Sequence, residues 1–269
     1  MFRKKNTILG PTSFFFLNNS DILKKILSLL ITVLLLPVTL TAQKEKVQND
    51  PTHDDRPIHF GFSLGVNAMD YRIELSQKAI QDRVFVGIKE LSPGINIHAI
   101  ANLRLAKYFD LRALPGISFG GRITYFVNDT LGTVLPPDKT DNKSYKKDAS
   151  YLEFPLTLKY KAKRLNNFRP YIIAGGNTRY DLAVKAAYDL NDQLIMTNPL
   201  NFFAEVGFGG DFYLTYFKLG IELKYSFGLT DIYRTTDRKG KQPDANIAPY
   251  TNYIQHIYSN MFIISFHFE

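Results

Sequence analysis

The sequence has no cysteine and no tryptophan among its 269 residues. Without cysteine, disulfide bonds, thiolate metal sites and cysteine nucleophiles are excluded. The mean hydropathy of −0.14 excludes a bundle of membrane-spanning helices. Histidine is scarce, and the five histidines show no metal-ligand spacing, so we expect no metal and no cofactor. Aromatic residues are abundant by contrast, because 21 Phe and 16 Tyr make up 14% of the chain. Such a composition is typical of β-strands or of a membrane interface.

The N-terminus carries the pattern of a secretory signal peptide. Lys24 and Lys25 precede an apolar run at 26–40, and the small residue Ala42 precedes a polar stretch. A membrane-spanning helix needs about 20 apolar residues, so this run favours cleavage over anchoring. We therefore predict a signal peptide at 1–42 and a short periplasmic segment at 43–56. Residues 1–42 hold five of the 33 Lys+Arg and one of the 25 Asp+Glu, so the mature chain has a net charge of +4. That balance does not indicate a nucleic-acid partner.

The mature chain alternates apolar and polar residues in eight segments. At 218–229, every odd position from Leu219 to Leu229 is apolar, and every even position is polar, charged or glycine. A period of two residues places the two kinds of side chain on opposite faces of a β-strand. The other segments with this alternation are 58–66, 95–105, 116–127, 151–162, 171–184, 202–214 and 257–268.

The lengths of the connections distinguish a membrane barrel from a soluble sandwich. Short connections are expected near 106–109, 162–168 and 214–217, and long ones near 75–93, 128–149, 185–201 and 231–256. Short turns on the side of both termini and long loops opposite are typical of outer-membrane barrels, whereas sandwiches have Greek-key crossings. The last strand ends with Phe266 and Phe268 in the apolar register. We predict an all-β fold, an eight-stranded antiparallel transmembrane β-barrel at 57–269. It would lie in the outer membrane, in contact with lipid, with periplasmic termini.

The polar face of the predicted barrel contains charges of both signs. The interior of an eight-stranded barrel is just filled by side chains, and an unpaired charge there would cost several kcal/mol. Near-equal numbers of acids and bases therefore predict a paired network and no porin-like channel. The predicted network comprises Arg104, Arg112, Arg122, Glu153, Lys159, Arg179, Asp181, Glu205, Asp211, Glu222 and Lys224.

Support for catalysis is weak. The candidate residues are His256 with Asp231, Asp237 or Asp244, all near the last long connection. General acid–base chemistry needs such groups within hydrogen-bond reach, and nothing in the sequence indicates that they meet. We expect no catalytic residues and no small-molecule substrate.

Two segments carry a resemblance to a known family. The sequences RPIHFGFSLGVNAMDYRI (Arg56–Ile73) and YLEFPLTLKYKAKRLNNFRPYIIAGGNTRYDLA (Tyr151–Ala183) resemble the PorT/SprT family of Bacteroidetes. The resemblance implies an outer-membrane barrel required for type IX secretion, which exports proteases, adhesins and gliding-motility proteins. It also implies protein partners in that apparatus, and it supplies no catalytic residues.

Positive charge is concentrated near the predicted turn between the fourth and fifth strands, at Lys161, Lys163, Arg164 and Arg169. Either these residues form a solvated turn near anionic lipid, or they dock a periplasmic component of the secretion apparatus. Lys161 also fits the inward register of its strand, which would place it in the lumen instead. Two other functions stay open for the whole protein. One is a generic small barrel with a structural, adhesive or ligand-binding role, and the other is a lipid or peptide hydrolase with its site at the rim.

Overall fold

The computed structural model describes residues 48–51, 56–128, 132–133, 145–186, 196–234 and 252–269. The predicted signal peptide at 1–42 and most of the predicted segment at 43–56 lie outside the described residues. Within the described ranges, no helix combines the length and apolar character needed to cross a membrane.

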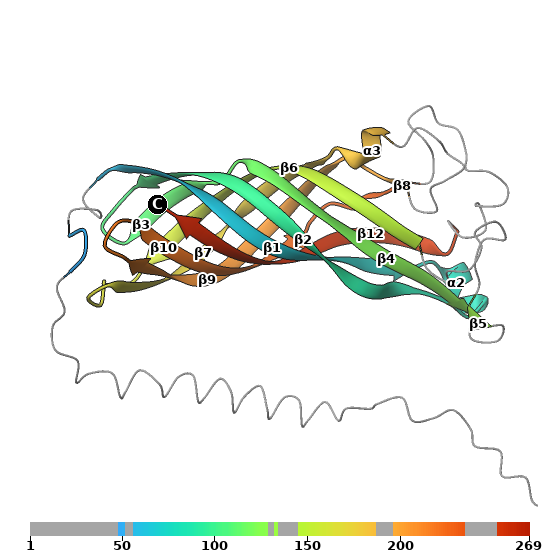
Figure 1. Ribbon diagram of the computed structural model, residues 1–269. Helices are drawn as coiled ribbons and strands as arrows, with labels where there is room; N and C mark the ends of the chain where they lie inside the picture. The colour runs from blue at the N-terminus through green and yellow to red at the C-terminus, as the bar shows by residue number, and fades with distance from the viewer. Residues whose placement is uncertain (1–47, 52–55, 129–131, 134–144, 187–195, 235–251) are drawn as a thin grey trace, which may run out of the picture. The chain divides into compact units, whose positions relative to one another are not determined.

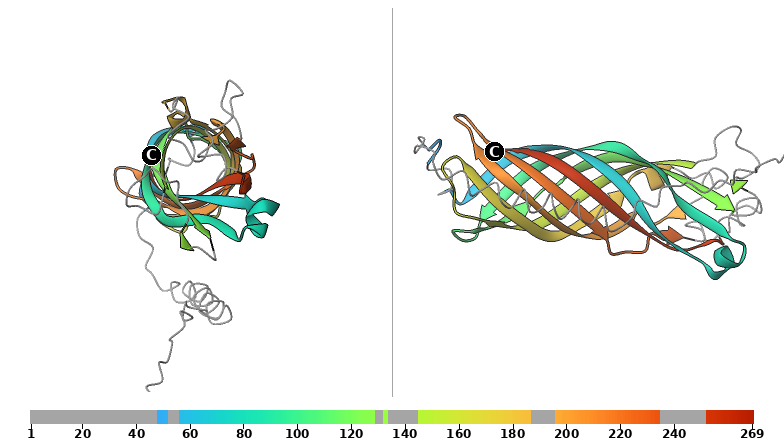
Figure 2. Two further views of the ribbon diagram at one scale, coloured as in Figure 1. Left: turned by 90° about the vertical axis from the view of Figure 1, so that its right-hand side faces the viewer. Right: turned by 90° about the horizontal axis from the view of Figure 1, so that it is seen from below.

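In the described part of the chain, eight antiparallel barrel strands form a closed ring (Figures 1 and 2). Closure follows from the pairing of β1 with both β2 and β12. The prediction of an all-β, eight-stranded antiparallel barrel is confirmed. The long strands are β1 (Ile58–Leu75), β2 (Val84–Arg104), β4 (Gly116–Asn128), β6 (Tyr145–Lys161), β7 (Phe168–Asp181), β9 (Leu200–Tyr213), β10 (Lys218–Gly228) and β12 (Ile254–Phe268).

The third strand of the barrel is interrupted by a proline. It consists of β3 (Phe109–Ala113) followed by β4, and both pieces pair with β2 and β6. Leu114 N–H donates to Pro155 O at 3.0 Å, and Ala99 N–H donates to Pro115 O at 2.9 Å. Neither proline can return the second hydrogen bond of its pair, because proline has no N–H. The third strand therefore keeps its direction across the proline, but each of these two residue pairs has one backbone hydrogen bond instead of two.

The two faces of the wall have opposite chemistry. Outward side chains such as Phe60 (74% exposed) and Phe208 (60% exposed) form an apolar surface, whereas Glu153 and Lys159 are fully buried inside. The seam between the first and last strands is closed by stacked rings of Phe62 and Phe268, whose centroids are 4.8 Å apart. This inside-out arrangement suits a wall surrounded by lipid.

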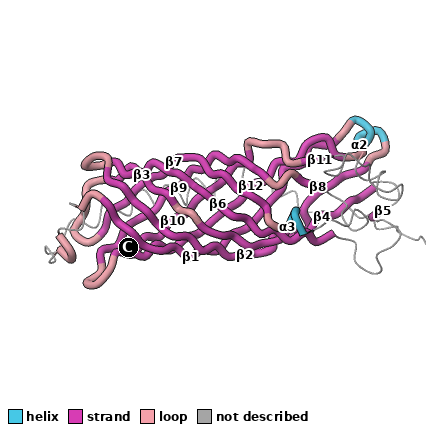
Figure 3. Tube along the Cα trace, turned by 90° about the horizontal axis from the view of Figure 1, so that it is seen from above, coloured by secondary structure: helices cyan, strands magenta, loops and turns pink. Residues whose placement is uncertain are grey.

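The end of the barrel that holds the C-terminus has short turns. β2 leads to β3, β6 to β7, and β9 to β10 through the tight connections at 105–108, 162–167 and 214–217. In the second of these, Asn166 has a positive φ of 55°, which asparagine tolerates better than most residues. The turns lie together at one end of the tube in Figure 3.

The opposite end differs from the prediction in one respect. A long loop was expected at 75–93, but β1 runs to Leu75 and β2 begins at Val84. Only 76–83 connects them, and it contains α2 (Gln77–Gln81), whose N-cap Ser76 accepts from the Ala79 N–H. The prediction was wrong because Asp70, Arg72 and Glu74 occupy outward positions and end the apolar alternation while the strand itself continues.

The remaining described elements are short and lie beyond the same end. They are β5 (Gly132–Thr133), α3 (Ala183–Ala186), β8 (Met196–Thr197) and β11 (Tyr233–Arg234). β5 extends the ladder of β4, and β8 pairs with β11 in a separate two-stranded sheet.

Candidate functional site

The interior of the barrel is filled with charged side chains. The buried cations come from β3, β4, β6, β7 and β10, and the buried carboxylates come from β3, β6, β7, β9 and β10. The buried charged residues are Asp110, Arg112, Arg122, Glu153, Lys159, Lys161, Arg169, Arg179, Asp181, Glu205, Asp211, Lys218, Glu222 and Lys224. Of the predicted network, Arg104 differs, since it lies half-buried at the end of β2.

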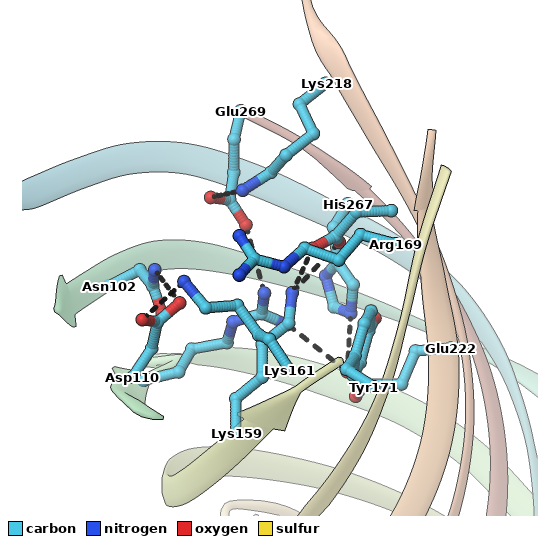
Figure 4. A network of polar contacts seen from close by, with 12 residues as sticks. Asn102, Asp110, Lys159, Lys161, Arg169, Tyr171, Lys218, Glu222, His267 and Glu269 are labelled. Atoms are coloured by element: carbon cyan, nitrogen blue, oxygen red, sulfur yellow. Dashed lines mark hydrogen bonds and ion pairs between the residues drawn. The ribbon is translucent and has the colours of Figure 1, made fainter. Parts of the chain in front are cut away.

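The end of the lumen near the C-terminus contains a cluster of ion pairs (Figure 4). Arg112 bridges two carboxylates, that of Glu222 at 3.2 Å and that of Glu269 at 3.1 Å. Glu269 also pairs with Lys218 Nζ at 2.6 Å. Neither Lys218 nor Glu269 belongs to the network predicted from the sequence. The sequence could have identified Lys218 as an inward-facing residue, because it lies at an even position of β10, as Glu222 does.

A second pair crosses from β6 to β9 in the same region. Lys159 Nζ contacts both carboxylate oxygens of Asp211, at 2.9 and 2.7 Å. The same ammonium lies 3.6 Å from the ring centroid of Tyr171, whose hydroxyl donates to Glu222 at 3.1 Å. Each charge in this layer therefore has a partner of opposite sign or an aromatic face.

A third group occupies the middle of the lumen. Arg179 lies between Glu153 at 2.9 Å and Glu205 at 3.0 Å, and Lys224 pairs with Glu205 at 2.9 Å. His98 contacts Glu153 at 3.1 Å, so each carboxylate is shared by at least two donors. Such sharing compensates the desolvation of buried carboxylates.

Arg122 lies farther from the C-terminal end and is held differently. Its guanidinium donates to the hydroxyls of Tyr71, Tyr151 and Ser259, and it lies 4.2 Å from the Tyr71 ring centroid. Asp181, also predicted in the network, accepts from Ala183 N–H at 3.0 Å at the start of α3. The predicted residues are thus brought into several layers along the lumen.

The predicted basic patch is not a surface cluster. Lys161 points into the lumen and pairs with Asp110 at 2.6 Å, and Arg169 is only 5% exposed. Arg164 binds the backbone carbonyls of Asn49 and Asp50 and stacks on Tyr213 at 3.6 Å. Of the four residues, the structure leaves Lys163 exposed. The four side chains therefore do not form one docking surface, because those of Lys161 and Arg169 are buried and that of Arg164 binds the chain itself.

Arg169 replaces a missing backbone donor. Ala162 N–H donates to Pro170 O at 2.9 Å, but Pro170 has no N–H to return to the Ala162 carbonyl. Arg169 Nε donates to that carbonyl instead, at 2.8 Å. The charge that suggested a docking residue therefore completes the hydrogen bonding of the wall.

The structure brings together one of the candidate catalytic pairs. His256 Nδ1 lies 2.6 Å from Asp231 Oδ2, a contact that nothing in the sequence indicates. Asp231 Oδ1 accepts from the backbone N–H groups of Tyr233 and Ile257, each at 3.0 Å. Slight burial raises the pKa of Asp231, but the hydrogen bonds from His256 and the two N–H groups outweigh it and lower the pKa below its usual value. Asp237 and Asp244 lie outside the described residues.

The pair lacks the other parts of a catalytic site in the described ranges. Among these residues, no hydroxyl hydrogen-bonds to His256, and no group of three or more potential ligands could hold a metal ion. As far as the described residues go, the arrangement is half of a triad, an oriented histidine without a positioned nucleophile.

Sequence comparison agrees with the geometry. Residues 41–234 match the family model described as "Outer membrane protein beta-barrel domain". The chain belongs to this family. Membership accounts for the closed ladder, the apolar exterior and the polar interior, and it indicates residence in the outer membrane. No curated protein matches the chain.

Proposed function

We propose that this outer-membrane barrel is a non-enzymatic component or accessory factor of type IX protein secretion. The observation that carries the proposal is the filled lumen, in which Arg112, Arg179 and Lys159 are fully buried and ion-paired. A lumen of this kind leaves no route for an exported chain, so the protein acts through its two ends. The resemblance of 56–73 and 151–183 to the PorT/SprT family supports the secretion pathway.

The topology belongs to the same proposal. Asn49 contacts Asn167 and the Tyr213 carbonyl, so the described N-terminal residues lie at the same end as the C-terminus. We propose that this end faces the periplasm, because short turns lie there in outer-membrane barrels. A tag inserted near Asp141 should be reached by antibody on intact cells. Labelling only after permeabilisation would invert the topology.

Deletion of the gene tests the pathway directly. We expect secreted cargo to be lost from the medium and restored by the wild-type gene. As a control, the abundance of unrelated outer-membrane barrels should not change. Normal export by the deletion strain would refute the secretion role and leave the generic barrel.

The His256–Asp231 pair favours one second candidate, a hydrolase with its site at the rim. A nucleophilic hydroxyl would then have to approach His256 Nε2 to about 3 Å. The variants His256→Ala and His256→Asn distinguish the two functions in the complemented deletion strain. Unchanged export by both supports the non-enzymatic role, whereas loss of export in both despite normal assembly supports catalysis.

A further inference from the structure

The barrel wall opens into a fork between β1 and β2. Their register ends at Ala68 and Pro93, although both strands continue beyond these residues. Beyond that point, β1 pairs with β12 as far as Leu75, and β2 pairs with β4 from Val84. Within the described residues, the segments 69–75 and 84–92 therefore each have a neighbour on one side only. We call these two segments the fork.

The sequence of β2 explains why the strands separate. The register of β2 with β4 shifts between Ser92 and Ile95 and again between Ile88 and Glu90. Such bulges bend a strand and increase its twist. At the base of the fork, a Cβ on Gly94 would lie 2.0 Å from Phe119 O, so only glycine permits the close approach there. The connection at the tip is eight residues with α2, rather than the two- to five-residue turn of a paired hairpin.

The open edges carry backbone donors and acceptors. Arg104 N–H donates to Pro57 O. Because hydrogen-bonded pairs alternate along an antiparallel ladder, the backbone N–H and C=O groups of the odd-numbered residues of β1 face β2. The backbone groups of Met69 and Ile73 consequently point into the fork. Tyr71 N–H has the same direction and is hydrogen-bonded by the Asp70 side chain at 2.8 Å. A side chain that caps its own strand edge is a means of protecting an edge from unwanted pairing.

The fork lies outside the apolar band of the wall. The outward side chains of β1 are apolar from Ile58 to Val66, but Asp70, Arg72 and Glu74 follow, and the last two side chains are 57% and 49% exposed. Unpaired backbone groups are tolerated in water and not in lipid. Near the tip, Ile80 and Phe85 are 68% and 56% exposed, which is apolar surface available for a protein contact.

We propose that the fork accepts an extended polypeptide segment as an additional β-strand. Neighbouring strands lie about 4.8 Å apart, so a strand between β1 and β2 needs a slot of about 9.6 Å. The five residues of α2 span about 7.5 Å. The other three residues of the connection at 76–83 lengthen it enough to reach across such a slot. The inserted segment would hydrogen-bond to both edges and alternate polar and apolar side chains, as strand-addition ligands do.

A second copy of the barrel is a poor occupant. Over most of their length, the long strands outside the fork pair on both sides in the described part of the chain, so a second copy has open edges at its own fork. Each of those edges belongs to a strand already paired with β12 or β4, so it can meet one edge of the fork but cannot enter the slot between the two. The proposal does not depend on the secretion role, because the occupant is defined by its extended backbone and its alternating polar and apolar side chains.

Amide hydrogen exchange on the full-length protein in detergent micelles tests the proposal. The probe is a nine-residue peptide of alternating Thr and Val, and the control probe is the same peptide with alternate amides N-methylated. We expect the fork amides at 69–75 and 84–92 to exchange faster than those at 59–67 in the free protein. The first peptide should protect both fork segments, and the methylated peptide should not.

Paired variants at one position separate backbone from side chain. Ile73→Pro removes an N–H that points into the fork, and Ile73→Ala shortens the side chain but keeps that N–H. We expect Ile73→Pro to weaken peptide binding about three- to tenfold relative to Ile73→Ala, the range for one or two hydrogen bonds. Heat-modifiable mobility in SDS gels identifies folded material for both variants.

Three results would overturn the proposal. Fork amides that are already protected in the free monomer would show that the protein's own chain fills the slot. Protection that appears only in a dimer, measured by native mass, would identify a second copy. Equal binding of both peptides, or equal affinities of both Ile73 variants, would show that the backbone edge is not the ligand site.

Discussion

The ion pair between Lys159 and Asp211 should show the energetic pattern of a buried, satisfied charge pair. Both side chains are at most 1% exposed, and the ammonium contacts both carboxylate oxygens within 2.9 Å. Replacing Lys159 by Met keeps most of the aliphatic stem but leaves the Asp211 carboxylate without its partner. Removing one member of such a pair typically costs about 3–5 kcal/mol.

The structure narrows that range. Lys218 and Arg112 are the next cations that act on Asp211, and they partly compensate the lost ammonium. We therefore expect Lys159→Met to destabilise the barrel by about 3 kcal/mol, which is more than a hundredfold in the folding equilibrium constant. The double variant Lys159→Met/Asp211→Leu removes both charges, and we expect it to lie within about 1 kcal/mol of wild type.

Urea titration of the barrel in lipid vesicles measures these differences. Because the chain has no tryptophan, the folded fraction is best followed by the unheated mobility in SDS gels. A coupling energy of at least about 2 kcal/mol between the two sites is expected from the double-mutant cycle. A Lys159→Met variant within about 1 kcal/mol of wild type, or additive effects in the cycle, would refute the view that the lumen is held by paired charges.

Three further predictions follow from other parts of the barrel. Arg169→Ala should destabilise by about 1–3 kcal/mol because it leaves the Ala162 carbonyl without a donor, and Pro170→Ala in that background should recover part of the loss in the same urea assay. Purified protein in planar bilayers should show no steady conductance, since the lumen is filled with ion pairs; reproducible open channels would contradict this. The pKa of Asp231 is lowered in the folded protein, so its stabilising effect is fully present above the usual pKa of about 3.9 and is lost progressively as the pH falls from there through the lowered pKa. Asp231→Asn should therefore lower stability at pH 7 and have a smaller effect near pH 3, and an equal effect at both pH values would argue against this pair.

The inward or outward direction of each strand residue could be predicted from the sequence because it depends only on the local pleat. Glu153 and Lys159 are an even number of residues apart in β6, and both side chains are fully buried. Which charges meet could not be predicted in the same way. The partner of Lys159 is Asp211, 52 residues away, and their contact depends on the register between β6, β7 and β9.

Residues at strand ends were the hardest to assign. Lys161 is the last residue of β6, so the sequence allows it either in the patch with Lys163 or, by the period of two, in the lumen. It points inward and pairs with Asp110. The role of Arg169 depends on the missing N–H of Pro170, and this became visible only with the pairing of Ala162 and Pro170. The contact of His256 with Asp231 likewise required the position of β12 beside the chain that follows β10.

The positions of the satisfied and open backbone groups limit where this barrel can make specific contacts. In the apolar band, an unpaired N–H or C=O costs several kcal/mol, and there the ladder is closed by β1 and β12 and repaired at Pro170 by Arg169. At the end that holds the C-terminus, the guanidinium of Arg164 donates to the Asn49 carbonyl. The opposite end holds the fork, where water can hydrogen-bond to unpaired strand edges. If the filled lumen transmits no solute, as we predict, the barrel makes its specific contacts at its ends, and the fork offers a backbone edge for a partner among the described residues.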